Sequence, residues 1–195
     1  MWISTRGFLY GIIAAPKNMK HIYICSSPIE GKGVSAGEKI KKGEAIQEIR
    51  GEARFLTVTN KEESLSYPNW IGVGKDKWID PEYPNQYLNH SCNPNAGING
   101  TIIVNKSDKS VKGKYVIVAL KPIKEGEEVT IDYSIIEGDD FWEMKCACGQ
   151  KGCRKIIRSI QYLPEKQFKK YFPDVPTYFK NLYLKQRKNQ GLAKA

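Results

Sequence analysis

The chain has 195 residues, of which 41% are hydrophobic, and a formal net charge of +10 at pH 7. This length holds one core domain and a small appended element, because domains usually contain roughly 100–200 residues. The 17 glycines and 10 prolines are spread along the chain and separate short β-branched runs, which argues against a helical bundle. We therefore expect a mostly β fold of the α+β class.

The first twenty residues are expected to form a separate N-terminal segment. Residues 8–15 follow Arg6 and imitate the apolar core of a signal peptide, but they are too few to span a membrane. The cysteines further along suit reduced metal ligands better than a disulfide framework. We expect an intracellular protein, cytoplasmic or nuclear, without membrane association.

Short strands separated by turns are predicted for the middle of the chain. Apolar or alternating runs predict strands at residues 21–26, 45–49, 78–79, 101–104, 115–120 and 127–131, the last of these being the final strand. Residues 31–33 are predicted to lie in a loop, and the polar residues 59–66 in a loop or a single helical turn. Beyond Leu163, aromatic residues interleaved with lysines predict two short amphipathic helices separated by Pro173 and Pro176.

The positive charge is concentrated near the C-terminus. Residues 1–150 carry nineteen Lys/Arg and nineteen Asp/Glu, whereas residues 151–195 carry twelve and two. A basic segment beside a neutral domain is typical of a protein that contacts nucleic acid or another polyanion. A solvated charged face explains the same pattern, so both interpretations stay open.

Three cysteines, Cys146, Cys148 and Cys153, lie within eight residues in a polar, glycine-containing loop. Thiols crowded into such a loop have no core to fill, which favours a structural zinc site with four tetrahedral ligands. Cys92 is the candidate for the fourth ligand. Cys25 lies in an apolar strand and is expected to be an ordinary core thiol.

Residues 89–95, with the sequence Asn-His-Ser-Cys-Asn-Pro-Asn, gather amides, an imidazole and a thiol in one turn-forming stretch. Core packing does not require so many hydrogen-bonding groups, which indicates a functional segment. The alternative is an elaborate turn in which His90 is a structural histidine.

These motifs in this order resemble a SET domain followed by a post-SET zinc segment. The resemblance rests on residues 89–95, on Glu-Glu-Val-Thr-Ile-Asp-Tyr at residues 127–133 and on the Cys-x-Cys-x4-Cys pattern, and it includes Glu-Gly-Lys-Gly-Val at residues 30–34. It implies a SET-domain fold of several small sheets at residues 21–135. A post-SET zinc segment at residues 136–158 and a basic helical tail at residues 159–195 then follow.

The resemblance also implies a function, that of an S-adenosylmethionine-dependent protein-lysine N-methyltransferase. Tyr133 is then the catalytic tyrosine and a contact of the methyl donor. The other implied donor contacts are Gly31, Lys32, Gly33, Asn89 and His90, and the implied ligands of a structural zinc are Cys92, Cys146, Cys148 and Cys153. The partner is a protein that carries the target lysine, and histones are one candidate. The alternative is a non-catalytic, zinc-stabilised SET-like module that binds nucleic acid through its basic tail.

Several positions depart from the family pattern. Ile49 stands where relatives commonly have a tyrosine in the wall of the active site, and residues 84–87 replace a common Ala-Arg-Phe lead-in. Ile98 and Ile131 stand where relatives often carry the aromatic residue that limits the number of methyl groups added. The acidic residues after Tyr133 fall where the resemblance places the rim of the substrate groove, although a solvated loop explains them equally well; they are Glu137, Asp139, Asp140 and Glu143.

A dinucleotide-binding motif is excluded by its context. Residues 31–36 fit the pattern G-x-G-x-x-A. That pattern must open a helix within a βαβ unit, whereas only five residues separate Gly37 from Gly43 and a β-patterned segment follows them.

Overall fold

The computed structural model describes residues 19–67 and 69–189. The apolar stretch at residues 8–15 therefore lies outside the described residues. Among the helices of the described part, none is long and apolar enough to cross a membrane.

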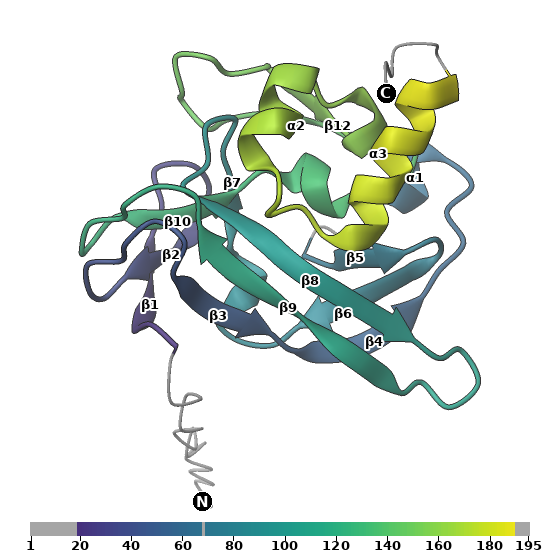
Figure 1. The fold of residues 1–195 in the computed structure, drawn as a ribbon, viewed down its shortest axis with the longest axis horizontal. Helices are drawn as coiled ribbons and strands as arrows, with labels where there is room; N and C mark the ends of the chain where they lie inside the picture. The colour runs from purple at the N-terminus through teal and green to yellow at the C-terminus, as the bar shows by residue number, and fades with distance from the viewer. Residues whose placement is uncertain (1–18, 68, 190–195) are drawn as a thin grey trace, which may run out of the picture.

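Short strands dominate the described part of the chain, as Figure 1 shows. The strands are β1 (Ile22–Ser26), β2 (Lys32–Ala36), β3 (Ala45–Ile49), β4 (Gly51–Phe55), β5 (Ile71–Gly74), β6 (Lys77–Pro81), β7 (Asn89–His90), β8 (Ala96–Val104), β9 (Val111–Ala119), β10 (Glu128–Ile131), β11 (Glu143–Lys145) and β12 (Ile156–Arg158). The helices are α1 (Lys61–Ser64), α2 (Glu165–Tyr171) and α3 (Thr177–Asn189), and the 3₁₀ helices are η1 (Asn85–Tyr87), η2 (Tyr133–Ile136) and η3 (Ile160–Tyr162). The predicted mostly β class is confirmed.

The strands form several small sheets rather than one large one. Their orders are β1-β2-β10-β7, β3-β9-β8, β4-β6-β5 and β11-β12. The pairings are antiparallel except for β10 with β7, which run parallel with Thr130 opposite Asn89 and Ile131 opposite His90. This parallel pair brings the segment that begins at Asn89 beside the segment that leads into Tyr133.

Several predictions about elements need correction. Two further strands, β11 and β12, follow residues 127–131, so that stretch is not the final strand. Lys32 and Gly33 lie in β2 rather than in a loop, because they pair with Ser26 and Cys25 of β1. The short strands β4, β5 and β7 were not predicted. Their pairing partners are distant in sequence or their runs are too short to carry a periodic signal.

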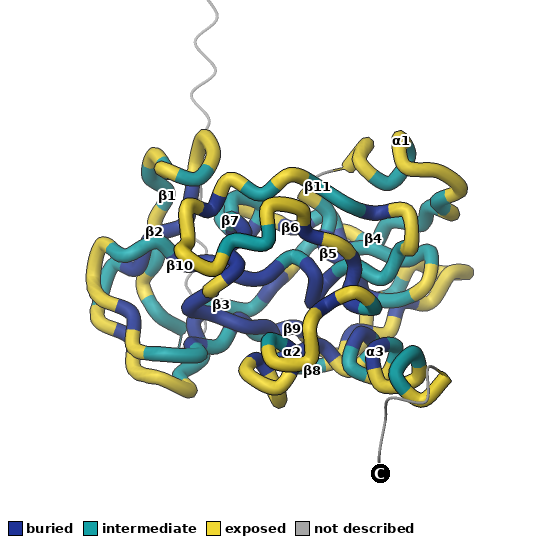
Figure 2. The backbone as a smooth tube through the Cα atoms, turned by 90° about the horizontal axis from the view of Figure 1, so that it is seen from above, coloured by how far each residue is buried: buried dark blue, intermediate teal, exposed yellow. Residues whose placement is uncertain are grey.

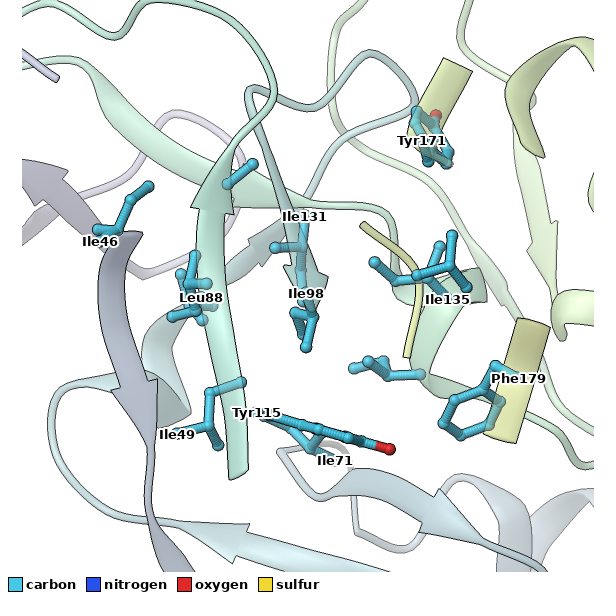
Figure 3. Close-up of a cluster of buried hydrophobic side chains, with 14 of the residues drawn as sticks. Ile46, Ile49, Ile71, Leu88, Ile98, Tyr115, Ile131, Ile135, Tyr171 and Phe179 are labelled. Atoms are coloured by element: carbon cyan, nitrogen blue, oxygen red, sulfur yellow. The ribbon is translucent and has the colours of Figure 1, made fainter. Parts of the chain in front are cut away.

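The hydrophobic core is continuous between the sheets and the C-terminal helices. Figure 3 shows Ile131 above Ile98 near its centre, with Tyr115 and Ile71 below them and Phe179 at one side. In Figure 2 the buried backbone runs through β3 and β9 in the middle of the molecule, while the loops around it are exposed.

The two C-terminal helices are part of this core. Pro164 precedes α2, where its fixed backbone angle suits a helix start, and Pro173 and Pro176 separate α2 from α3. The two helices bury their aromatic faces in the same cluster as the sheets, through Phe168, Tyr171, Phe179 and Tyr183. The charged side chains of the tail therefore lie on the outer face of a packed element.

Replacing Phe179 with alanine should lower the free energy of unfolding by about 3–5 kcal/mol, because it leaves a cavity between α3 and the sheets. Leu184 on the same helix is 48% exposed, and Leu184→Ala should change stability far less. Urea unfolding of the two variants decides this. Equal, small effects would mean that α3 does not stabilise the domain.

Candidate active site

A cavity of about 360 Å³ opens between the first sheet and the segment after β10. Its wall includes five residues that matter for the site: Lys32, Asn89, Ile131, Tyr133 and Glu137. Four aromatic side chains also line it, namely Tyr67, Trp70, Tyr87 and Trp142, and of these only Tyr87 lies in a stretch that was singled out from the sequence. The cavity is therefore partly apolar, with a few polar groups at fixed positions, as small-molecule sites usually are.

The Glu128 carboxylate does not line the cavity itself, but it holds Asn89, which does. Ser27 Oγ lies 2.9 Å from both Glu128 oxygens, and Asn89 Nδ2 donates to Glu128 Oε1 at 2.8 Å. Asn89 Nδ2 also donates to the Lys32 carbonyl oxygen at 2.9 Å. A Cβ atom on Gly33 would collide with this carboxylate, so a larger residue there would have to displace Glu128 from Ser27 and Asn89. Asn89 and the start of β2 are thereby fixed to each other.

The predicted donor contacts stay predictions, and the structure places most of them at or near the cavity. Gly31, Lys32 and Asn89 line the cavity, and Gly33 lies just behind it against Glu128. Sequence reasoning missed Ser27 and Glu128. The signal for Glu128 was present, since it is a carboxylate inside a predicted strand, but its partners come from segments far away in sequence.

His90 lies behind the cavity wall and contacts Tyr133, which lines it. Its ring is buried, and its Nδ1 accepts a hydrogen bond from the Tyr133 backbone N–H at 3.1 Å. Burial lowers the pKa of His90 to about 4, so the ring is neutral at pH 7. With Nδ1 as acceptor, the proton of a neutral ring sits on Nε2, which faces Cys92 Sγ at 3.3 Å. The predicted contact of His90 with the donor remains a prediction.

Tyr133 begins η2 and its hydroxyl donates to the Leu88 carbonyl oxygen at 2.7 Å. Burial, together with the nearby carboxylates of Glu30 and Glu128, raises the pKa of Tyr133 above its ordinary range. The phenol therefore stays protonated at neutral pH. It is suited to orienting a reacting group by hydrogen bonding rather than to removing a proton as a base.

Three of the four predicted zinc ligands meet beside this site. The Sγ atoms of Cys92, Cys146 and Cys148 and a ring nitrogen of His90 all lie within 4.8 Å of one another. The Cys92 and Cys146 sulfurs are 3.6 Å apart, and tetrahedral zinc with bonds of about 2.3 Å places its thiolates about 3.8 Å apart. Cys153 lies at the edge, with its Sγ 3.9 Å from the Cys146 carbonyl oxygen. The donor set thus fits a zinc ion.

The Cys148 thiol has a lower pKa than an ordinary cysteine, which favours the thiolate that a metal ion binds. Burial opposes ionisation of this thiol, but the backbone N–H groups of Cys92 and Gln150 outweigh burial and lower the pKa of Cys148 to about 7. The thiolate is the form that binds metal. Cys25, by contrast, lies in β1 beside Ser35 and has no part in this cluster.

The departures from the family pattern are divided between the core and the cavity wall. Ile49 and Ile98 are buried in the core and do not line the cavity, whereas Ile131 does. Asn85, Gln86 and Tyr87 of the altered lead-in line it as well.

The acidic residues after Tyr133 have different environments. Glu143 pairs with Lys61 at 2.7 Å and with Arg158 at 3.6 Å, so it is not free to receive a substrate cation. Glu137 lines the cavity, and burial raises its pKa well above the usual range. Asp139 and Asp140 line a second cavity of about 300 Å³ that shares Glu137 with the first.

Comparisons with known proteins agree with this geometry. A family model for the SET domain matches residues 31–134. The histone-lysine N-methyltransferase trr of Drosophila melanogaster is 30% identical over 164 residues, which cover 77% of this chain and 6% of that protein. The histone-lysine N-methyltransferase ASHH3 of Arabidopsis thaliana is 30% identical over 153 residues, which cover 72% of this chain and 39% of that protein. The chain belongs to the SET domain family.

The fold has a solved counterpart. A crystal structure of KRYPTONITE in complex with mCHH DNA, an H3(1-15) peptide and SAH aligns with a TM-score of 0.51 at 22% sequence identity, covering 72% of this chain and 30% of that one. At this identity the likeness concerns the fold alone. The chain spans well under half the length of the two relatives above.

Proposed function

We propose that the protein is an S-adenosylmethionine-dependent protein-lysine N-methyltransferase. The observation that carries the proposal is the convergence of Asn89, Lys32 and the Tyr133 hydroxyl on one cavity in a SET-domain chain. Relatives named histone-lysine N-methyltransferases support a protein lysine as the acceptor. A histone is the first substrate to test, and a histone substrate implies a nuclear site of action.

The proposed chemistry is a direct methyl transfer. The lone pair of a deprotonated substrate lysine attacks the sulfonium methyl carbon, the carbon–sulfur bond breaks, and its electron pair remains on sulfur. Lysine has an ordinary pKa near 10.4, so the ammonium must first lose its proton to solvent. The apolar wall of Ile131, Trp142 and Ile136 disfavours the charged amine, and the neutral Tyr133 hydroxyl can align it.

We assign a structural zinc to Cys92, Cys146, Cys148 and Cys153, with His90 as a hydrogen-bond donor to Cys92. The support for four thiolates is that His90 Nδ1 already accepts from Tyr133, which leaves the proton on Nε2. When bound, zinc would tie the segment that carries Trp142 to the segment that carries Asn89. The ion has no part in the methyl transfer itself.

The proposed substrate groove follows the carboxylates between the two cavities. Glu137 lies at their shared wall, and Asp139 and Asp140 extend along the second, next to Trp78 and Phe141. Carboxylates beside aromatic rings suit a peptide with basic residues around the target lysine. Asp139 and Asp140 are thus the acidic residues to test in substrate binding.

We also propose that the outer face of the tail contacts nucleic acid near the substrate. The segregation of positive charge into residues 151–195 favours it. Several of the basic residues have structural partners: Lys169 pairs with Glu165 at 2.6 Å, and Arg187 Nη2 donates to the Leu163 carbonyl oxygen at 3.3 Å. The exposed Lys166, Lys185 and Lys188 are the better candidates.

Replacing Tyr133 with phenylalanine should lower the single-turnover rate by about a hundredfold or more, because the aligning hydroxyl is lost while the ring still packs. Donor affinity, measured by calorimetry, should change little. Tyr23→Phe on β1 is the matched control, since its ring is 40% exposed and outside the cavity. An unchanged rate in Tyr133→Phe would remove the residue from the catalytic role.

Metal analysis should find one zinc per chain, and Cys148→Ser should weaken zinc binding and lower activity together. Cys25→Ser is the matched control, because this thiol lies outside the cluster. Cobalt substitution distinguishes the ligand sets: His90→Gln should keep the spectrum of a four-thiolate site, whereas Cys153→Ser should change it. Active protein without zinc would contradict the assignment.

Replacing Lys166, Lys185 and Lys188 with glutamine should weaken DNA binding and reduce the slope of log affinity against log salt by about 0.9 for each lost phosphate contact. Turnover on a short peptide should not change. The same replacement of Lys106, Lys109 and Lys112, which are exposed in the β8–β9 hairpin, is the control. If the tail variant binds DNA with the original affinity and slope, the charge is only a solvated surface.

A further inference from the structure

One buried carboxylate links the C-terminal tail to the catalytic segment. Asp132 is 0% exposed and directly precedes Tyr133. Its Oδ1 accepts from Arg154 Nη2 at 2.6 Å and from the Ser134 N–H at 3.1 Å, and its Oδ2 accepts from the Tyr171 hydroxyl at 3.1 Å. A buried charge is strongly destabilising unless it is paired in this way. The position of Asp132 therefore depends on residues that follow the SET motifs in the chain.

The same two partners also hold Cys92. The Arg154 backbone N–H and Nε donate to Cys92 Sγ at 3.4 and 3.5 Å. The Tyr171 hydroxyl lies 3.4 Å from the Cys92 carbonyl oxygen, close to its shorter contact with Asp132. A positive guanidinium beside a thiolate ligand offsets the negative charge that four thiolates bring to a zinc ion.

Tyr171 is placed for this role by its helix. It ends α2, and Figure 3 shows its side chain at the margin of the hydrophobic cluster, with the ring against the core. The ring is 1% exposed, so packing restricts its rotation and fixes the direction of the hydroxyl. The hydroxyl reaches a polar network that otherwise consists of Asp132, Arg154, Ser134 and the 89–92 segment.

We infer that Tyr171 is a positioning residue for the proposed methyl transfer: its hydroxyl orients Asp132 and Arg154 and so sets the spacing between Cys92 and Tyr133. The effect on turnover rests on the proposed function, whereas the effect on Cys92 does not. His90 provides a second link between Cys92 and Tyr133, because its ring contacts both Cys92 Sγ and the Tyr133 N–H. Helix α2 of the basic tail thus supports the segment that carries Tyr133.

The test compares Tyr171→Phe with Tyr183→Phe in the full chain. Both tyrosines are buried on the tail helices, but in the described part of the structure the Tyr183 hydroxyl has no hydrogen-bond partner. Tyr171→Phe should weaken zinc binding about tenfold in competition with a chromophoric chelator, as loss of a group that supports a metal ligand typically does. It should also lower kcat more than it changes KM for the donor. Tyr183→Phe should alter neither.

The outcomes separate the inference from the proposed function. Wild-type zinc affinity and wild-type kcat in Tyr171→Phe would overturn the inference. Weaker zinc binding in Tyr171→Phe, together with a wild type that transfers no methyl group, would support the link to Cys92 and refute the proposed function.

A second measurement covers the case in which Tyr171→Phe does not fold. Removal of zinc from the wild-type protein should speed hydrogen exchange in α2, which carries no zinc ligand, and leave the tip of the β8–β9 hairpin unchanged. Unaltered exchange in α2 after zinc removal would overturn the inference.

Discussion

The burial of Asp132 is the constraint on which the rest of the site depends. A carboxylate with no access to water must find its partners inside the protein, and here they are Arg154, Ser134 and Tyr171. Arg154 follows the cysteine loop and Tyr171 is the last residue of α2. The Asp132 carboxylate therefore gains both partners only when these two segments have packed against it. Tyr133 follows Asp132 directly. Tyr133, the proposed catalytic tyrosine, is thus in place only in a chain that has assembled its C-terminal part.

The main contribution of the proposed site to catalysis is the alignment of the reacting groups. Glu128 is held by Ser27 and Asn89 and fixes the start of β2, while His90 receives the Tyr133 N–H. Because burial keeps the Tyr133 phenol protonated, strong base catalysis is not available from it. A reaction between a neutral amine and a sulfonium needs little acid–base assistance once desolvation has favoured the neutral amine. The site therefore matches the chemistry proposed for it.

The residues proposed to bind the donor, the metal and the substrate amine were easier to predict from the sequence than the residues that hold them in place. Asn89, Tyr133 and the cysteines stand in ordered motifs of unusual composition, and strands such as β3 and β9 carry their own periodicity. Glu128 and Asp132 stand inside the motif at residues 127–133, yet their roles and that of Arg154 were not predicted, because these roles arise from contacts between segments distant in the chain. The tail was expected to be an appended basic element. Its two amphipathic helices were predicted from their aromatic residues, but periodicity alone does not say against what a helix packs, and here the aromatic faces fill the core.

The most direct test is mass spectrometry of histones, and of a wider protein extract, after incubation with the purified chain and S-adenosylmethionine that carries deuterated methyl groups. The account predicts deuterated methyl groups on lysine side chains, and the loss of that signal when Tyr133 is replaced by phenylalanine. A folded, zinc-loaded chain that leaves every lysine unlabelled would contradict it. The fold would then serve as a zinc-stabilised binding module.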